Sequence, residues 1–375
     1  MRSNFLNALA GLALACAMVA CGGQSETAPT PMPTPTPTPT PTPAPTPLAA
    51  GIYLFAKSPD SFVLDFDGKN TGGKCDLSGI LNLAIDSSAR VFAITTWRLP
   101  IVATAPPPAV SLCANIAATG SMPLSGEFGQ LLFSSLAVGS SGKLFASATR
   151  SNGLGNVVAE VAVANPTGVT TNIEKPLERM FVVAADGSFY SSDGFIVRKT
   201  TATGVSTILA GVPRLTNTPT FSVDGTGSAA RFSGVSGIAV NANGDIYVAD
   251  SGSTIRKVSS AGVVTTIAGS AIIKGALDGP GPAARFGNLN SIVVDSAGNI
   301  FAADTANHAI RKITPQGVVS TVVGQLGVPG YALGALPGLL NAPQALAIDS
   351  SDVLYLIVIT TLNNLPAIEI LKVKP

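Results

Sequence analysis

Histidine, tryptophan and charged side chains are scarce in this sequence. Of its 375 residues one is histidine and one is tryptophan, and Asp, Glu, Lys and Arg together make up 11%. Zinc centres are usually built from several His or Cys ligands, so the lone His308 argues against a zinc enzyme. The net charge of +1 provides no basic surface for a phosphate backbone, so we expect no nucleic-acid partner. Aromatic residues reach only 6%, which disfavours a sugar-binding face built on ring stacking.

The common catalytic motifs are also missing. The sequence contains no Gly-x-Ser-x-Gly, His-Glu-x-x-His or phosphate-loop pattern. What it does contain is 39 glycines, 28 prolines and 46% hydrophobic residues. The hydrophobic residues fall into many short runs between glycine-containing turns, which indicates an all-β protein.

The N-terminus reads as a targeting segment rather than part of the fold. Arg2 precedes an uncharged run over residues 5–20, which is too short for a comfortable membrane-spanning helix. The run ends at Met-Val-Ala before Cys21, which resembles the bacterial lipobox, although leucine usually stands where this chain has Met18. We therefore predict a lipoprotein signal peptide over residues 1–20 and lipidation of Cys21. Cys16 is the rival acceptor, and an ordinary signal peptide is the alternative.

Residues 21–48 are predicted to form a lipidated N-terminus and a stalk. Every odd position from Pro29 to Pro47 is proline, with Thr, Met or Ala between. Alternating prolines favour polyproline II, which gives a semi-rigid spacer of about 60 Å. We expect a lipid-anchored protein of the cell envelope. Gly22 follows the cysteine, which resembles the pattern of lipoproteins that two-membrane bacteria pass to the outer membrane. We therefore expect an outer-membrane position if the bacterium has two membranes.

The remainder, residues 49–375, is repetitive. Residues 237–251 (GIAVNANGDIYVADS) and 291–305 (SIVVDSAGNIFAADT) each read as strand, polar turn, strand and Asp. Aligned turn residues recur every 45 to 57 residues, which defines six units: Ala89, Gly142, Gly187, Gly244, Gly298 and Asp352. Four short strands per unit at this period are typical of a propeller blade. We predict a six-bladed β-propeller of four-stranded antiparallel blades.

The last unit lacks one strand before the chain ends. A strand from the N-terminal side, in residues 51–58 or 61–67, is predicted to join the last blade and close the ring. Such closure removes most of the exposed sheet edges.

The repeats resemble the NHL family, which is named after an Asn-His-Leu triplet. The triplet survives once, as Asn307-His308-Ala309, and residues 224–233 (DGTGSAARFS) and 278–287 (DGPGPAARFG) resemble segments between blades of bacterial NHL proteins. The resemblance is strongest over residues 181–350 and implies a propeller that commonly has six blades. Relatives that act as lyases build metal sites, for which this chain lacks the histidines.

Three units carry an Asp at the end of the second strand, and the same units carry an Arg in the third. The acids are Asp193, Asp250 and Asp304, and the bases are Arg198, Arg256 and Arg311. We expect these carboxylates to bind the Arg or the turn within their own unit. Together with His308 they are also the candidate residues of the channel mouth. No cofactor is predicted, with calcium on these carboxylates as the alternative.

Cys75 and Cys113 are the only cysteines of the predicted domain. An exported protein meets an oxidising compartment, so we predict a disulfide between them. The alternative is a pair of buried free thiols.

These observations favour a monomeric, non-enzymatic binding or scaffold protein displayed on the cell surface. Its protein or small-molecule ligand would bind where residues 211–235, 269–290 and 324–343 gather with the turns at 250–254 and 304–309. The alternative is a metal-dependent lyase or hydrolase of the six-bladed propeller type.

Overall fold

The structure, a computed structural model, describes most of one compact unit, Leu48–Pro375. The described residues are 50–57, 80–86, 91–95, 99–103, 112–116, 131–139, 141–150, 156–161, 169–173, 180–214, 221–362 and 365–375. The predicted signal peptide, the stalk, Cys21 and Cys75 lie outside them, as does the strand proposed at 61–67. Within the described ranges, no helix combines the length and apolarity needed to cross a membrane.

The described chain is built from antiparallel strands. In its first part these are β1 (Gly51–Lys57), β2 (Ile80–Ile85), β3 (Val91–Thr95), β4 (Leu99–Ala103), β5 (Leu112–Ile116), β6 (Leu131–Val138), β7 (Leu144–Arg150), β8 (Asn156–Val161), β9 (Val169–Ile173), β10 (Met180–Val183), β11 (Phe189–Ser192), β12 (Ile196–Thr200) and β13 (Ser206–Gly211).

The second part continues the pattern and adds three short 3-10 helices. Its elements are β14 (Gly225–Thr226), η1 (Gly227–Ala229), β15 (Val235–Val240), β16 (Ile246–Asp250), β17 (Thr254–Val258), β18 (Val263–Gly269), β19 (Gly279–Pro280), η2 (Gly281–Ala283), β20 (Leu289–Val294), β21 (Ile300–Asp304), η3 (Thr305–Asn307), β22 (Ala309–Ile313), β23 (Val318–Gly324), β24 (Leu346–Ile348), β25 (Leu354–Leu362) and β26 (Leu365–Lys374).

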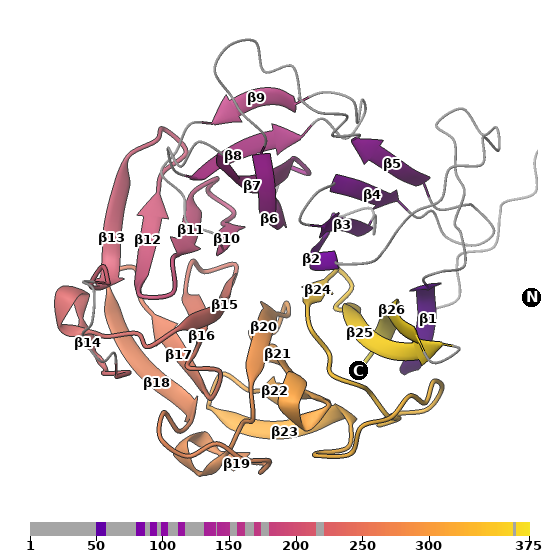
Figure 1. The fold of residues 1–375 in the computed structure, drawn as a ribbon. Helices are drawn as coiled ribbons and strands as arrows, with labels where there is room; N and C mark the ends of the chain where they lie inside the picture. Colours follow the sequence, from indigo (N-terminus) through magenta and orange to yellow (C-terminus); the bar gives the residue numbers. More distant parts are fainter. Residues whose placement is uncertain are drawn as a thin grey trace, which may run out of the picture. The chain divides into compact units, whose positions relative to one another are not determined.

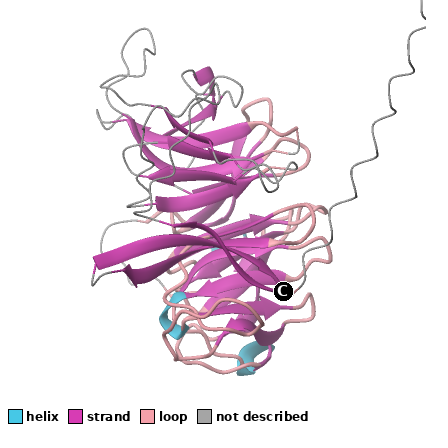
Figure 2. Ribbon diagram, turned by 90° about the vertical axis from the view of Figure 1, so that its right-hand side faces the viewer, coloured by secondary structure: helices cyan, strands magenta, loops and turns pink. Residues whose placement is uncertain are grey.

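The sheets are arranged as a propeller. The first strands of successive units contact one another in a closed cycle, β2 to β6, β10, β15, β20, β24 and back to β2. In Figure 1 these strands lie nearest the centre and the later strands of each unit lie outward. Figure 2 turns this arrangement by 90° and shows how little helix it contains. The predicted all-β propeller is therefore confirmed.

Burial within each sheet explains its sequence. All five residues of β16 (IYVAD) and of β21 (IFAAD) are buried, because a neighbouring sheet covers both faces of the strand. One core cluster joins Tyr247 and Ile255 of one sheet to Ile300 of the next, with Phe286 of the connecting segment between them in sequence. A middle strand therefore shows a continuous apolar run instead of alternation. The outer strand β18 alternates at its start, since Val263 is exposed and Val264 is buried.

A glycine ends the outer strand of several units because the chain turns there against a backbone carbonyl. Gly269 has a φ of 89°, and a Cβ on it would lie 2.2 Å from the Ser253 carbonyl oxygen. Gly211 and Gly324 are in the same situation, at 2.2 and 2.3 Å from a carbonyl oxygen. Only glycine fits such a site without moving the backbone. The recurring final glycine of the repeat is thus a packing requirement.

Two sheets have five strands, where the sequence predicts four. In each of these sheets, the incoming chain pairs with the outer strand before it reaches the innermost one. These pairs are β14 with β18 and β19 with β23. The chain then passes η1 or η2 and reaches the innermost strand, β15 or β20. The prediction of four strands is wrong for these two units, because the incoming segment itself supplies a short edge strand.

The first unit also differs from the prediction. Its described strands form two separate two-stranded sheets, β2–β3 and β4–β5, rather than one sheet of four. Strands β3 and β4 nevertheless contact each other. Cys113 lies in β5, opposite Val102 of β4, while Cys75 lies outside the described residues. Their disulfide stays a prediction.

The two ends of the described chain share one sheet. Strand β1 pairs antiparallel with β26, and the strand order is β1-β26-β25-β24. On its other side, Ile52 exchanges two backbone hydrogen bonds with Gly334, of 2.7 and 2.9 Å. The Ile52 side chain is buried in a cluster with Leu354 and Leu371. Residues 51–57, one of the two segments considered for the additional strand, pair with the last sheet.

Candidate functional site

Asp250 and Arg256 form a buried ion pair inside one sheet. Asp250 ends β16, Arg256 lies in β17, and both side chains are completely buried. Arg256 Nη1 lies 2.9 Å from Asp250 Oδ2. Asp250 Oδ1 also accepts hydrogen bonds from the backbone amides of Ser233 and Gly234, at 3.0 and 2.9 Å. A buried ion pair is tolerable when its remaining polar atoms are bonded in this way.

The same arginine holds the segment that enters the sheet. Arg256 Nη2 donates to the Val223 carbonyl at 2.6 Å and to Asp224 Oδ1 at 2.8 Å. Its Nη1 donates to the Arg231 carbonyl at 2.6 Å. The guanidinium carbon lies 4.9 Å from the centroid of the Phe232 ring, a cation–π distance. One side chain therefore fastens both ends of residues 223–234 to the sheet.

Asp224 completes this arrangement at the outer strand. Its Oδ2 accepts a hydrogen bond from the Thr266 amide of β18, at 2.8 Å. Burial raises the pKa of the Asp224 carboxyl, but the hydrogen bonds from Thr266 and Arg256 outweigh this effect, so its pKa lies below the ordinary value. We call the set of Asp224, Asp250 and Arg256 a connector clamp.

The next unit repeats the clamp with Asp278, Asp304 and Arg311. Arg311 Nη1 lies 2.9 Å from Asp304 Oδ2, and Nη2 lies 2.6 Å from Asp278 Oδ1. The guanidinium lies 5.0 Å from the Phe286 ring centroid. Asp304 Oδ1 accepts from the amides of Gly287 and Asn288 at 3.0 and 3.1 Å. The predicted Asp–Arg pairing is confirmed for these two units.

The third predicted pair does not form. Asp193 is exposed and accepts hydrogen bonds from the amides of Phe195 and Ile196, at 2.8 and 3.0 Å. Arg198 instead donates to Ser206 Oγ at 3.3 Å. The turn from Asp193 to the start of β12 at Ile196 is one residue shorter than the turn from Asp250 to β17. Asp193 also lies beyond the end of β11 at Ser192, whereas Asp250 is the last residue of β16. Of the two predicted partners, the arginine and the turn, this carboxylate binds its turn.

His308 is a turn residue. It lies after η3 in the left-handed conformation (φ 56°, ψ 36°), which histidine adopts more readily than most residues. Its Nδ1 accepts a hydrogen bond from the Ala342 amide at 3.1 Å. Nearby, Thr305 Oγ1 donates to the Pro343 carbonyl at 2.5 Å. The turn thus fastens the segment that leads into the last sheet.

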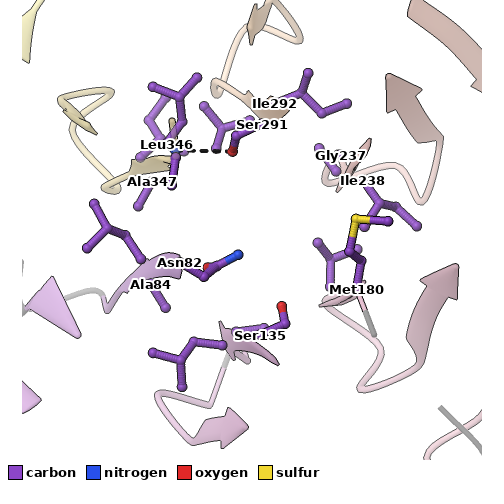
Figure 3. Close-up of a pocket in the computed structure, with 18 of the residues that line it drawn as sticks. Asn82, Ala84, Ser135, Met180, Gly237, Ile238, Ser291, Ile292, Leu346 and Ala347 are labelled. Carbon is purple, nitrogen blue, oxygen red and sulfur yellow. Dashed lines mark hydrogen bonds between the residues drawn. The ribbon is translucent and has the colours of Figure 1, made fainter. Parts of the chain in front are cut away.

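A cavity of about 370 Å³ lies on the axis of the ring. It is lined by residues of the six innermost strands and by Gln344 and Ala345, which precede β24. Figure 3 shows part of this lining. Among the described residues that line it, none is acidic, basic or histidine. Asp193, Asp250, Asp304 and His308, which the sequence suggested for the channel mouth, are not among them.

Within the part of the chain that the structure describes, no three or more His, Cys, Asp or Glu side chains lie together as metal ligands would. The carboxylate oxygens of Asp250 and Asp304 accept hydrogen bonds from arginine and from backbone or side-chain donors. The described candidates therefore serve the fold.

Sequence reasoning did not single out Asp224 and Asp278. The signal was present, because Asp224 precedes Arg256 by 32 residues and Asp278 precedes Arg311 by 33, each in the repeated segment D-G-x-G-x-A-A-R-F. Asn82 and Ser135 of the cavity wall were also missed. No repeated motif marks them, since the equivalent position varies among the units and repeats the serine of β6 only at Ser291 of β20.

Comparison with known proteins gives one family match. The NHL repeat model matches residues 232–253, the segment that runs from the connector clamp through β15 and β16. No curated protein sequence matches the chain.

Solved structures resemble it in fold. A protein of unknown function from Bacteroides thetaiotaomicron VPI-5482 has a TM-score of 0.59 at 16% identity, covering 86% of this chain and 76% of that one. An auxiliary nutrient binding protein of the same organism has a TM-score of 0.57 at 15% identity, with coverages of 87% and 76%. A putative phosphatase, again from this organism, has a TM-score of 0.55 at 14% identity, with coverages of 87% and 79%. At such identities the likeness concerns the fold alone.

The connector clamp predicts coupled stability losses. Asp250→Ala and Arg256→Ala should each lower the free energy of unfolding by about 3–5 kcal/mol, because each leaves a buried charge without its partner. The double variant should lose less than the sum of the two. Urea denaturation of the full chain measures all three, and Asp193→Ala, at an exposed turn, should cost only about 1 kcal/mol. Additive losses, together with a wild-type melting temperature that rises with calcium and an Asp250→Ala variant that does not respond, would identify a cation site instead.

Proposed function

We propose that this chain, an NHL-repeat β-propeller protein, is a non-enzymatic binding protein of the cell envelope. Its ligand site is the connector face, by which we mean residues 221–234, 270–288 and 325–343 with the turns 250–254 and 304–309. These segments begin and end at one end of the sheets, where Val235 pairs with Asp250 and Leu289 with Asp304. Between these points the first two follow an outer strand toward its other end, where Gly225 pairs with Val264 and Gly279 with Val319.

The observation that carries the proposal is the exposure of large apolar side chains on these segments. Ile272 is 93% exposed and Phe221 is 74% exposed. Further exposed residues of the same segments are Val223, Ile273, Leu277, Val328, Tyr331 and Leu333. Each of the three connectors carries at least two of these side chains. Exposed apolar surface beyond scattered single residues marks interaction sites on soluble proteins. The rigid clamps beneath hold these segments in place, as is usual for binding loops on a scaffold.

Hydrogen bonds to Ser270 hold the connector tip at Ile272 and Ile273 in a defined turn. Ser270 Oγ accepts hydrogen bonds from both of their amides, at 3.3 and 3.1 Å. This local turn presents two isoleucines side by side with Lys274 following. Such a tip suits insertion into an apolar groove of a protein partner, and we take a protein as the ligand of the connector face.

The number of blades and the closure of the ring belong to the same proposal. Six innermost strands contact in a cycle, and β3 contacts β4 although they fall in separate sheets. We therefore count β2–β5 as one blade, which makes six. The pairing of β1 with β26 then completes the last blade and closes the ring. A rigid, closed ring suits a domain displayed at the end of a stalk.

The proposed placement at the membrane rests on the sequence. Cys21 would carry the lipid, and the Pro/Thr segment would lift the propeller away from the membrane surface. An outer-membrane position is proposed for a bacterium with two membranes. Metabolic labelling with a fatty-acid analogue should mark the wild type and leave Cys21→Ser unmarked; equal labelling of both would remove the anchor from this proposal.

The competing function is a metal-dependent lyase or hydrolase. The putative phosphatase among the similar structures would favour it only if a catalytic group lay in the cavity. The described lining contains no side chain that titrates. An auxiliary nutrient binding protein of the same fold supports a binding role by analogy. We therefore prefer binding.

Site-specific photo-crosslinking in intact cells tests the proposal. A benzoyl-phenylalanine at position 272 or 277 of the full-length protein should yield a discrete protein adduct, and Ile273→Asp should reduce it at least severalfold. The matched control is position 205, a Val that is 61% exposed but lies in the turn before β13. Adducts of equal yield at 205, or none at the connector positions, would refute the connector face as the site.

A further inference from the structure

The axial cavity has walls of sheet edges. Each of the strands β2, β6, β10, β15, β20 and β24 stands at the end of its sheet's strand order. A strand in that place presents a row of backbone N–H and C=O groups that no neighbouring strand pairs. Small residues such as Ala84, Gly237 and Ala347 are part of the lining and leave the backbone groups accessible from the cavity. The wall is therefore rich in amide donors and acceptors.

Most polar side chains at the cavity are already occupied in joining the blades. Asn290 Nδ2 donates to Gln344 Oε1 at 2.9 Å, and Ser236 Oγ donates to the Leu289 carbonyl at 2.6 Å. Ser291 Oγ accepts from the Leu346 amide at 3.1 Å, the bond drawn in Figure 3. These bonds join three successive sheets and fix the shape of that side of the cavity.

Asn82 and Ser135 are different. They come from β2 and β6, which contact each other, and both side chains point into the cavity in Figure 3. Neither side chain has a hydrogen-bond partner among the described residues. Ser135 is 3% exposed as a residue, and its hydroxyl is directed into the cavity. The Asn82 amide can donate and accept hydrogen bonds, and so can the Ser135 hydroxyl. Both groups therefore face the same space.

The chemistry of this space selects its ligand. A charge moved from water into a cavity without a counter-charge is strongly disfavoured, and the described lining carries no charge. The aliphatic part of the lining, from residues such as Ile238, Ile292 and Leu346, favours apolar atoms beside the polar ones. A volume of about 370 Å³ is at the small end of ligand pockets.

We propose that the axial cavity is a second binding site, for a small uncharged molecule that both donates and accepts hydrogen bonds, with Asn82 and Ser135 as its recognition residues. An aliphatic amide is the simplest compound of this class. The site is separate from the connector face and does not depend on the proposed protein ligand.

Ligand-observed NMR and thermal unfolding of the purified full chain test this. The probes are cyclo(Gly-Val), a neutral cyclic dipeptide, and the open dipeptide Gly-Val, which is nearly equal in size and zwitterionic at pH 7. We expect saturation transfer and a higher melting temperature with cyclo(Gly-Val) and neither with Gly-Val. Asn82→Leu and Ser135→Ala should each weaken binding about three- to tenfold, the loss of one hydrogen bond.

The matched control is Asn243→Leu, at an exposed turn between β15 and β16, which should bind like the wild type. Ser135→Ala removes one oxygen atom and keeps the test open if Asn82→Leu fails to fold. No binding of cyclo(Gly-Val) at millimolar concentration, equal binding of Gly-Val, or unchanged affinity in Ser135→Ala would each overturn the proposal. Because the connector face plays no part in this measurement, its failure and that of the proposed function are distinguishable.

Discussion

The rest of the structure depends on the hydrogen bonds that the buried arginine of the connector clamp donates. Arg256 joins the second strand of its sheet, through Asp250, to both ends of the incoming segment, through the carbonyls of Val223 and Arg231. A guanidinium has enough fixed donors to do this without an unsatisfied charge in the core. The innermost strand begins directly after this segment, so the clamp sets where the strand enters the ring.

The clamp also separates structure from function. Carboxylates that a propeller enzyme would place around a metal are here turned into the sheet, where Asp304 meets Arg311 and Asn307. What remains at the surface are apolar tips on fixed segments, and what remains on the axis is a neutral cavity. We propose both as surfaces for binding. The clamp residues give the connectors their fixed positions.

Much of the fold could be predicted because it repeats. Glycine turns, short apolar runs and the recurring Asp gave the strands and the propeller, and the NHL repeat match falls on one of the best copies. The Asp–Arg pairs form where the Asp is the last residue of the second strand, as Asp250 and Asp304 are, and not at Asp193, which follows the end of β11 and binds its own turn. Sequence pattern does not resolve the end of a strand to a single residue.

Other features depend on contacts between distant segments. The short strands β14 and β19 exist only because the incoming chain lies against an outer strand. Asn82 and Ser135 face the same cavity because two units are neighbours in the ring, although each looks like an ordinary polar residue in its own strand. Local patterns carry no information on such meetings, so the cavity could not be predicted from them.

Hydrogen exchange of the backbone amides bound by the clamps tests the central claim most directly. The amides of Ser233, Gly234, Gly287 and Asn288 lie in connectors, yet each donates to a buried carboxylate. If the clamps hold the propeller together, these amides should exchange only on global unfolding, as slowly as those of β16 and β21. Exchange at the rate of exposed loops, with the strands still protected, would contradict the account.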